Sequence, residues 1–134
     1  MMMLNVLLID DDKINNFLNR SIIEKHCGNE CVVVSEFINP EEAFDFLKDC
    51  AIANHENCPD VIFLDINMPE MSGFELLEKM IEEKVSLPKT RIFILSSSLD
   101  PNDIERSRSF QVVSDFISKP LDKLKIEQIK ASIG

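Results

Sequence analysis

Basic residues are scarce in this sequence of 134 residues. Lysine and arginine together number 14, whereas aspartate and glutamate number 24, so the formal net charge is -10. Such a charge repels the phosphate backbone of nucleic acids and anionic lipid headgroups. We therefore expect neither nucleic acid nor a membrane surface among the direct partners of the chain.

Features of exported and membrane proteins are also missing. The apolar start MMMLNVLLI has no basic segment before it and no small-residue cleavage site after it, and three aspartates follow at once. It is therefore neither a signal peptide nor a membrane span. We expect a cytoplasmic protein. Tryptophan and tyrosine are absent, so intrinsic fluorescence offers no probe of this chain.

The sequence has no C-x-x-C pair. Its four cysteines are Cys27, Cys31, Cys50 and Cys58. In a cytoplasmic chain of this size they are most simply explained as small buried apolar side chains. A zinc site that combines them with His26 or His55 is the alternative, although the spacings match no common zinc template. We expect His26 at the end of a helix and His55 in a loop.

Five apolar runs recur at regular intervals, with no repeat, low-complexity tract or linker between them. They lie at residues 4–9, 31–37, 60–64, 91–95 and 112–117. Three of them are unbroken apolar blocks, which a strand needs when both faces of its sheet are covered. This pattern favours a parallel sheet, and the size of the chain favours a single domain.

Helix-start signals separate these runs. The expected N-caps are Asn39, followed by Pro40 and Glu42; Ser72, followed by Glu75; and Asp100, followed by Pro101. Each combines a side chain that can cap a helix with a proline or an acid in the first turn. The alternation predicts an α/β fold of type (βα)5, in which right-handed crossovers build an open, doubly wound, five-stranded sheet.

Apolar residues at helical spacing predict which face of a helix packs on the sheet. For the first helix these residues are Ile14, Phe17, Leu18 and Ile22. For the third helix they are Phe74, Leu77, Met80 and Ile81.

Chemically active side chains follow the apolar strands. They are Asp10, Asp11 and Asp12 after the first, Asp65 after the third, Ser96 at the end of the fourth and Lys119 after the fifth. Ligands of a doubly wound sheet gather at this carboxyl edge. Carboxylates brought together there repel one another unless a cation joins them, and an all-oxygen set suits Mg2+ better than zinc.

Each of these residues has a simpler explanation when taken alone. The acidic run can be a solvated loop with a helix cap, Lys119 a surface lysine, and Ser96 a strand-end hydroxyl bonded to its own backbone. Together, a carboxylate, a hydroxyl and a lysine beside an acidic pair are the groups that phosphoryl transfer to Asp65 needs.

Four motifs carry a resemblance to a known family. LLIDDD at 7–12, LDINMPEMSG at 64–73, ILSSS at 94–98 and FISKPL at 116–121 follow in order. On these motifs the whole chain, residues 1–134, resembles the response-regulator receiver domain of two-component systems. The resemblance implies a flavodoxin-like fold with strand order 2-1-3-4-5.

The resemblance also implies roles for individual residues. Asp65 would be the phosphoacceptor, and Asp11 and Asp65 would hold Mg2+ together with the backbone carbonyl of Asn67, while Asp10 would act mostly through water. Lys119 would contact the acyl phosphate from beside a cis bond to Pro120, and Ser96 would donate its hydroxyl to another phosphoryl oxygen. Phe116 would take part in the switch, where the family commonly has tyrosine. Ser97 and Asn67 border the site, and Asn15 would lie where a phosphodonor docks.

The implied function is that of a single-domain response regulator. It would accept a phosphoryl group from a histidine kinase or a histidine phosphotransfer protein and signal to an unknown target through the face of the fourth helix, fifth strand and fifth helix. The final helix, about 122–133, leaves no residues for an output domain. Two alternatives stay open: a docking module that works without phosphorylation, and a phosphohydrolase that uses Asp10 and Asp12.

Overall fold

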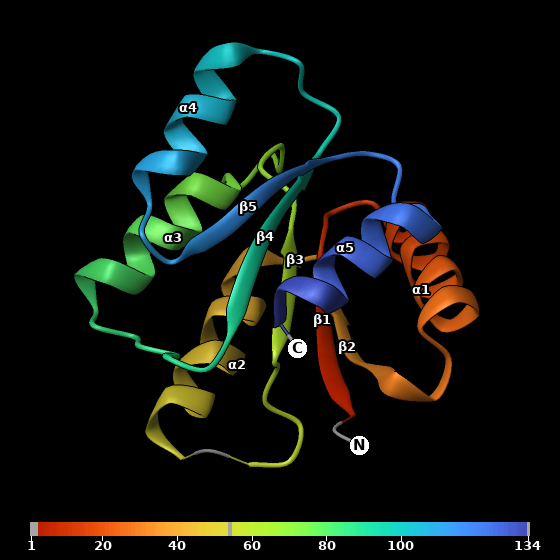
Figure 1. Cartoon of the computed structure of the whole chain (residues 1–134). Helices are drawn as coiled ribbons and strands as arrows, with labels where there is room; N and C mark the ends of the chain where they lie inside the picture. The colour runs from red at the N-terminus through yellow and green to blue at the C-terminus, as the bar shows by residue number, and fades with distance from the viewer. Residues whose placement is uncertain (1–2, 54, 134) are drawn as a thin grey trace.

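Strands and helices alternate along the chain. The computed structural model describes residues 3–53 and 55–133. The strands are β1 (Leu4–Ile9), β2 (Cys31–Phe37), β3 (Val61–Leu64), β4 (Arg91–Ser96) and β5 (Val113–Ser118). The helices are α1 (Lys13–Cys27), α2 (Pro40–Ile52), α3 (Gly73–Glu82), α4 (Pro101–Ser109) and α5 (Lys123–Ile133), with a short 3-10 turn, η1 (Gly28–Glu30), before β2 (Figure 1). Within the described ranges, no helix has the length and apolarity that crossing a bilayer needs.

The strands form one parallel sheet in the order β2-β1-β3-β4-β5. This confirms the predicted (βα)5 architecture and the strand order that the resemblance implied. The predicted strands are accurate to within a residue at either end: β3 begins at Val61, and β4 and β5 extend to Ser96 and Ser118.

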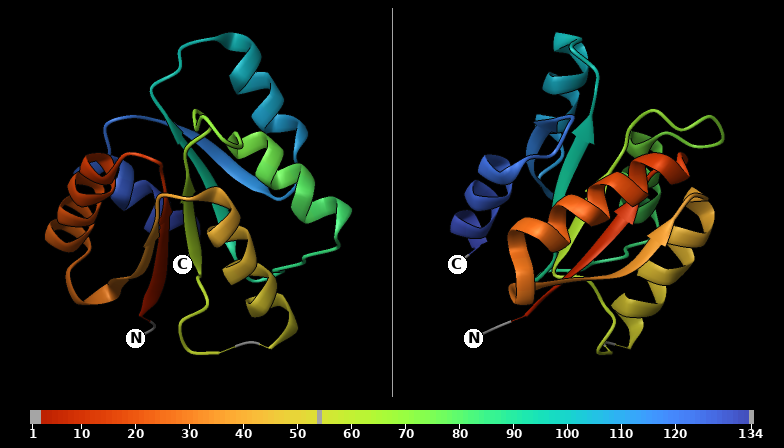
Figure 2. Two further views of the ribbon diagram at one scale, coloured as in Figure 1. Left: turned by 180° about the vertical axis from the view of Figure 1, so that it is seen from behind. Right: turned by 90° about the vertical axis from the view of Figure 1, so that its right-hand side faces the viewer.

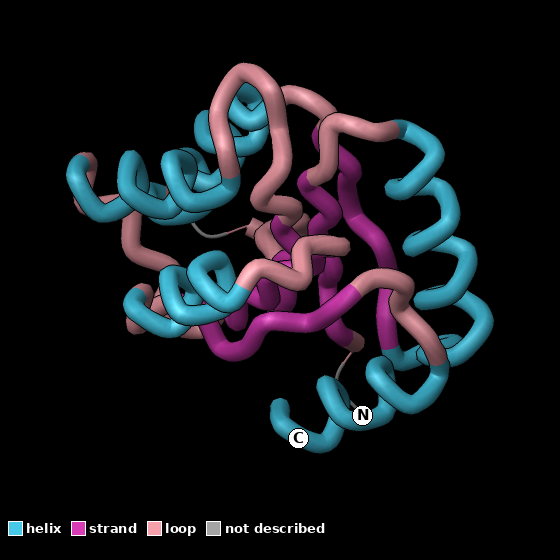
Figure 3. Tube along the Cα trace, turned by 90° about the horizontal axis from the view of Figure 1, so that it is seen from above, coloured by secondary structure: helices cyan, strands magenta, loops and turns pink. Residues whose placement is uncertain are grey.

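Helices cover both faces of the sheet, as the views from the side and from above show (Figures 2 and 3). On one face α1 and α5 pack through Ile23 and Ile126 against Leu8 of β1 and Phe63 of β3. On the other face the buried residues of α2 and α3 pack against alternate residues of the same strands. Every residue of β3 is buried, as an unbroken apolar strand between two helical layers requires.

The predicted helix starts are confirmed. Asn39 accepts hydrogen bonds from the backbone N–H groups of Glu41 and Glu42, and Asp100 accepts one from Asn102. Ser72 and Glu75 form a complete capping box at the start of α3. These caps satisfy N–H groups that have no partner within the helix.

The predicted buried face of α1 is wrong for three of its four residues; only Ile22 packs, partly buried, against the core. Ile14, Phe17 and Leu18 are 67%, 64% and 50% exposed, whereas Asn16 and Asn19 are buried. Asn16 Nδ2 donates to the carbonyl oxygen of Asp10 at 2.9 Å, so a polar contact with the end of β1 helps to set the rotation of the helix. The spacing of apolar residues alone cannot predict such a polar contact. In α3 the prediction holds for Phe74, Leu77 and Met80, but Ile81 is exposed.

The cysteines are also arranged differently from the prediction. Cys27 and Cys50 are buried as expected, but Cys31 and Cys58 are only half-buried, and the structure pairs Cys27 with Cys31 and Cys50 with Cys58 as disulfides. The intervals between the cysteines do not reveal these pairs, because it is the fold that brings the two sulfurs of each pair together. His26 lies in the last turn of α1 and His55 in the connection between α2 and β3, as predicted.

Candidate functional site

The acidic residues meet where β1 and β3 end. These strands are neighbours in the sheet, and the backbone N–H of Asp65 donates to the carbonyl oxygen of Ile9 at 2.9 Å. One oxygen from each of Asp10, Asp11 and Asp65 lies within 4.8 Å of the others. Asp10 and Asp65 are buried, with 4% and 6% exposure, whereas Asp11 faces solvent.

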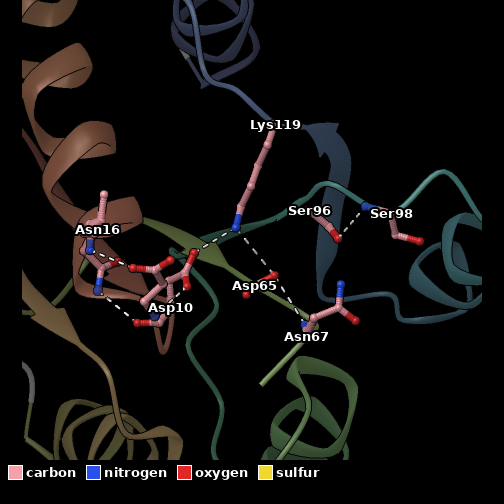
Figure 4. Close-up of polar contacts among 9 residues, drawn as sticks. Asp10, Asn16, Asp65, Asn67, Ser96, Ser98 and Lys119 are labelled. Atoms are coloured by element: carbon pink, nitrogen blue, oxygen red, sulfur yellow. Dashed lines mark hydrogen bonds and ion pairs between the residues drawn. The ribbon is translucent and has the colours of Figure 1, made fainter. Parts of the chain in front are cut away.

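Lys119 brings a positive charge to this cluster from the end of β5. Its Nζ lies 2.8 Å from Asp10 Oδ2 and 3.8 Å from Asp65 Oδ1 (Figure 4). The backbone N–H of Lys119 donates to the carbonyl oxygen of Ser96 at 2.9 Å, which ties the ends of β5 and β4 together. The peptide bond between Lys119 and Pro120 is cis.

Backbone amides orient the two buried carboxylates. The N–H of Asp12 donates to Asp10 Oδ1 at 2.9 Å, and the N–H of Asn67 donates to Asp65 Oδ1 at 3.3 Å. The carboxylate of Asp12 itself is exposed and caps α1 by accepting a hydrogen bond from the N–H of Ile14 at 2.8 Å. Asp12 therefore serves the helix and not the acidic cluster.

Burial raises the pKa of the Asp65 carboxyl from 3.8 to about 6. Loss of solvation is the largest cause, and the negative charges of Asp10 and Asp11 act in the same direction. The ammonium of Lys119 and the N–H of Asn67 lower the pKa of Asp65 but do not offset burial. The site thus holds a carboxylate whose ionised form is poorly stabilised by the protein alone.

The donor set fits a hard divalent cation. One ammonium cannot neutralise three carboxylates, and all the side-chain atoms that face one another in the acidic cluster are oxygens. The exposure of Asp11 leaves one side open to water, and Mg2+ commonly keeps several water ligands. The structure thus brings together the three predicted carboxylate ligands. Asn67, whose backbone carbonyl is the fourth predicted ligand, lies directly beyond Asp65 and contacts its carboxylate through the backbone N–H.

The predicted switch residues lie on the neighbouring strands. Ser96 is fully buried, and its Oγ accepts a hydrogen bond from the N–H of Ser98 at 3.1 Å, which leaves its own hydroxyl hydrogen free to donate. Ser97 is exposed. Phe116 of β5 is partly buried and packs against the core on the α2 and α3 side. Asn15, in the first turn of α1, is half-buried.

Two residues that support the site were missed in the sequence. Asn16 holds the end of β1 through the carbonyl of Asp10. At Gly73 a Cβ atom would lie 2.5 Å from the carbonyl oxygen of Asp65, so only glycine lets α3 start this close to Asp65. Gly73 closes the motif LDINMPEMSG and follows the cap Ser72, but residue spacing carries no signal for this close approach.

Comparisons with known proteins agree with this geometry. The family profile described as response regulator receiver domain matches residues 6–131. A two-component response regulator of Oryza sativa subsp. japonica is 32% identical over 129 residues, which cover 96% of this chain and 93% of the relative. The crystal structure of a two-component response regulator from Cytophaga hutchinsonii has a TM-score of 0.84 and 31% identity, and the match covers 99% of this chain and 98% of that one.

Several relatives are much longer proteins. A protein-glutamate methylesterase/protein-glutamine glutaminase of Burkholderia thailandensis is 32% identical over 88% of this chain, which spans only 29% of the relative. The chain spans 7% of hybrid signal transduction histidine kinase L of Dictyostelium discoideum, at 30% identity. The chain therefore belongs to the response regulator receiver domains of two-component signalling.

Proposed function

We propose that Asp65 accepts a phosphoryl group from the phosphohistidine of a histidine kinase or a histidine phosphotransfer protein. The observation that carries this proposal is the position of Asp65: a buried carboxylate at the end of a central strand, with Lys119 Nζ 3.8 Å away and Asp10 and Asp11 beside it. A receiver domain of two-component signalling provides the context for such a reaction.

The reaction is an in-line displacement at phosphorus. An oxygen of Asp65 forms a bond to phosphorus while the bond between phosphorus and the donor imidazole nitrogen breaks, and the imidazole leaves with a proton from solvent. The N–H of Asn67 holds Asp65 Oδ1 and leaves Oδ2 available for attack. Positioning of this kind accounts for much of the barrier reduction in phosphoryl transfer.

Charge compensation comes from Lys119 and from a metal ion. Lys119 Nζ lies within 4 Å of both Asp10 and Asp65, so a small movement of its flexible side chain brings it onto an oxygen of the arriving phosphoryl group. Asp10, Asp11, Asp65 and the carbonyl of Asn67 would hold Mg2+, which when bound neutralises negative charge on the transferring oxygens.

Signalling would follow from Ser96 and Phe116. The free hydroxyl hydrogen of Ser96 can donate to a phosphoryl oxygen, which draws the end of β4 towards the site. Phe116 has no hydroxyl to form a new hydrogen bond, so it would respond through packing alone. We infer that the face of α4, β5 and α5 changes its contacts with a downstream protein, with a coupling energy of about 1–3 kcal/mol. Ser97, exposed beside Ser96, would border access to the phosphoryl group.

The phosphodonor would dock on α1. Ile14, Phe17 and Leu18 form an exposed apolar patch at the start of this helix, directly after the acidic run that contains Asp10 and Asp11. Asn15 follows Ile14 in the sequence and is half-buried. An apolar helical surface on the donor, next to its phosphohistidine, would cover this patch and hold phosphorus near Asp65. The patch adjoins the acidic site, and this favours the donor over other occupants.

A phosphohydrolase that uses Asp10 and Asp12 is disfavoured. Such an enzyme would need both carboxylates at the reacting phosphorus, but Asp12 is engaged as the cap of α1 and faces solvent. The other alternative, a docking module that works without phosphorylation, predicts that the chain takes up no phosphoryl group, and the following experiment tests this.

Incubation with Mg2+ and acetyl phosphate, followed by an intact mass measurement, tests the proposal. We expect one added phosphoryl group in the parent chain and none in Asp65→Asn. Asp12→Asn is the matched control, because asparagine also caps helices and Asp12 lies outside the cluster; it should be labelled like the parent chain. An unlabelled parent chain would support the docking module instead, and release of acetate over many turnovers by Asp65→Asn would support the hydrolase.

A further inference from the structure

A second cluster of ligating side chains lies at the opposite edge of the sheet. Cys50 belongs to the last turn of α2, and His55 and Cys58 follow in the connection that leads to β3. Figure 1 shows this connection at the end of the sheet away from the acidic site. One ligand atom from each of Cys50, His55 and Cys58 lies within 4.8 Å of the others.

We propose that Cys50, His55 and Cys58, with both thiols reduced, bind one zinc ion that joins the end of α2 to the start of β3. Sulfur and imidazole nitrogen are the ligands that zinc prefers, and three protein ligands leave a fourth position for water. The sequence left a zinc site with His26 or His55 as the alternative, because the spacings match no common template; the fold, and not the sequence interval, brings these three groups together.

The distance from the His55 imidazole to one sulfur suits tetrahedral coordination, whereas the two sulfurs, bonded to each other in the structure, must move apart on reduction. His55 Nε2 lies 3.6 Å from Cys50 Sγ. Bond lengths of about 2.3 Å to sulfur and about 2.05 Å to nitrogen place two tetrahedral ligands about 3.5 Å apart. His55 is exposed, so water and the ion can reach the cluster, whereas Cys50 is buried and anchors it.

The connection is held in place by the neighbouring strand. Asn5 of β1 donates through Nδ2 to the carbonyl oxygens of Glu56 at 2.6 Å and Cys58 at 3.1 Å. The His55 ring forms an edge-to-face contact with Phe46 of α2, with ring centroids 5.8 Å apart. The ligands therefore stay near one another without the metal, which lowers the entropy that binding must overcome.

Zinc binding and disulfide formation exclude each other. Zinc binds the two thiolates, so two thiol protons pass to solvent. With hydrogen peroxide as oxidant, the two sulfurs instead form the Cys50–Cys58 bond that the structure contains, and the two protons and two electrons convert peroxide to two water molecules. A disulfide has no thiolate to offer, so the oxidised chain cannot hold the ion through sulfur.

The structure provides a reporter of the metal-free state. The N–H of Asn57 donates to His55 Nδ1 at 3.2 Å, which requires a bare nitrogen at Nδ1. Zinc on Nε2 leaves the hydrogen on Nδ1, so this hydrogen bond is lost. We expect the amide resonance of Asn57 to move when zinc binds to the reduced chain.

Titration of the reduced full chain with Co2+, in excess Mg2+ to fill the acidic site, tests the proposal. Thiolate ligands to Co2+ produce absorption in the near ultraviolet, where a chain without tryptophan or tyrosine is nearly transparent. We expect one Co2+ per chain with thiolate bands, displacement of Co2+ by Zn2+, and no bands after oxidation with hydrogen peroxide.

Variants identify the ligands. Cys58→Ser should abolish the thiolate bands of a two-sulfur site, and His55→Ala, at an exposed position, should weaken Co2+ binding by at least about tenfold. Cys27→Ser with Cys31→Ser is the matched control and should bind like the parent chain. Absence of thiolate bands in the reduced chain, or their loss only in the control, would overturn the proposal.

Discussion

Lys119 Nζ lies 2.8 Å from Asp10 Oδ2, closer to this carboxylate than to Asp65, the phosphoacceptor that we propose. The lysine comes from the end of β5 and the aspartate from the end of β1, two strands that are not neighbours in the sheet. The ion pair therefore links the ends of β5 and β1 on one side of the acidic site. A metal ion bound to Asp10 would therefore compete with Lys119 for this carboxylate.

Removal of this ammonium should separate metal binding from phosphorylation. In Lys119→Met the affinity for Mg2+ should rise by about tenfold, because the cation no longer competes or repels, whereas labelling by acetyl phosphate should fall. Isothermal titration and intact mass measure the two effects. Lys48→Met, which removes an exposed pair with Glu83, is the control and should change neither. Weaker Mg2+ binding in Lys119→Met would contradict the competition.

The affinity for Mg2+ should depend on pH. The pKa of Asp65 is raised to about 6, so a proton occupies this ligand below that pH. Once pH is below about 6, affinity should fall by up to about tenfold for each further pH unit, and it should level off above about 7. Titrations at several pH values measure this dependence. An affinity that stays constant down to about pH 5 would show that Asp65 is not a ligand with a raised pKa.

The same pKa predicts a stability change. Because the folded state raises the pKa of Asp65 above its unfolded value of 3.8, ionisation favours the unfolded chain, and stability without metal is lost as pH rises from about 4 through 6. Asp65→Asn should therefore raise the free energy of unfolding by about 1–3 kcal/mol at about pH 7. Urea unfolding followed by circular dichroism measures it.

The gain from Asp65→Asn should shrink towards pH 4, where the carboxyl is protonated in both states. Asp12→Asn, at an exposed cap, should leave the free energy of unfolding nearly unchanged. A variant Asp65→Asn that is less stable than the parent chain at neutral pH without metal would contradict the unfavourable burial of this charge.

Gly73 should be essential for the position of Asp65. Gly73→Ala puts a Cβ atom 2.5 Å from the carbonyl oxygen of Asp65, so the start of α3 or the end of β3 must move. We expect a loss of about 2–4 kcal/mol of stability and slower labelling by acetyl phosphate. Gly28→Ala is the control: Gly28 has φ +58° but open space around it, so it should cost about 1 kcal/mol and leave labelling intact.

The patch on α1 should matter only for a protein donor. Phe17→Ser with Leu18→Ser should slow transfer from a phosphorylated histidine phosphotransfer protein by about tenfold or more, because these exposed side chains would contact the donor. Labelling by acetyl phosphate, which needs no docking surface, should not change. Ile52→Ser, an exposed apolar residue of α2, is the control. Equal transfer rates in the parent chain and in the double variant would exclude this docking surface.

Strand ends and helix caps could be predicted because both depend on local signals. Unbroken apolar runs placed Asp65 and Ser96 at the carboxyl edge, and Ser72 and Glu75 predicted the start of α3 correctly. The strand order came from the family resemblance, since no local pattern specifies which crossover connects to which neighbour.

Contacts that depend on how a helix or loop folds back on its neighbouring strand could not be predicted. The amide of Asn16 reaches the carbonyl of Asp10, and this turns Phe17 towards solvent against the hydrophobic pattern. The side chains of Cys50, His55 and Cys58 likewise come together because of the way the connection after α2 folds back. The close approach of Gly73 to Asp65 depends on the angle at which α3 meets β3. Each is a property of tertiary packing rather than of residue spacing.

The site of phosphorylation is the most direct test of the central claim. After labelling with acetyl phosphate and Mg2+, reduction with borohydride converts an aspartyl phosphate to homoserine, and peptide mass spectrometry locates it. We predict homoserine at position 65 and unmodified aspartate at positions 10, 11 and 12. Homoserine at any of those three positions, or at none of the four, would contradict the assignment of Asp65 as the phosphoacceptor.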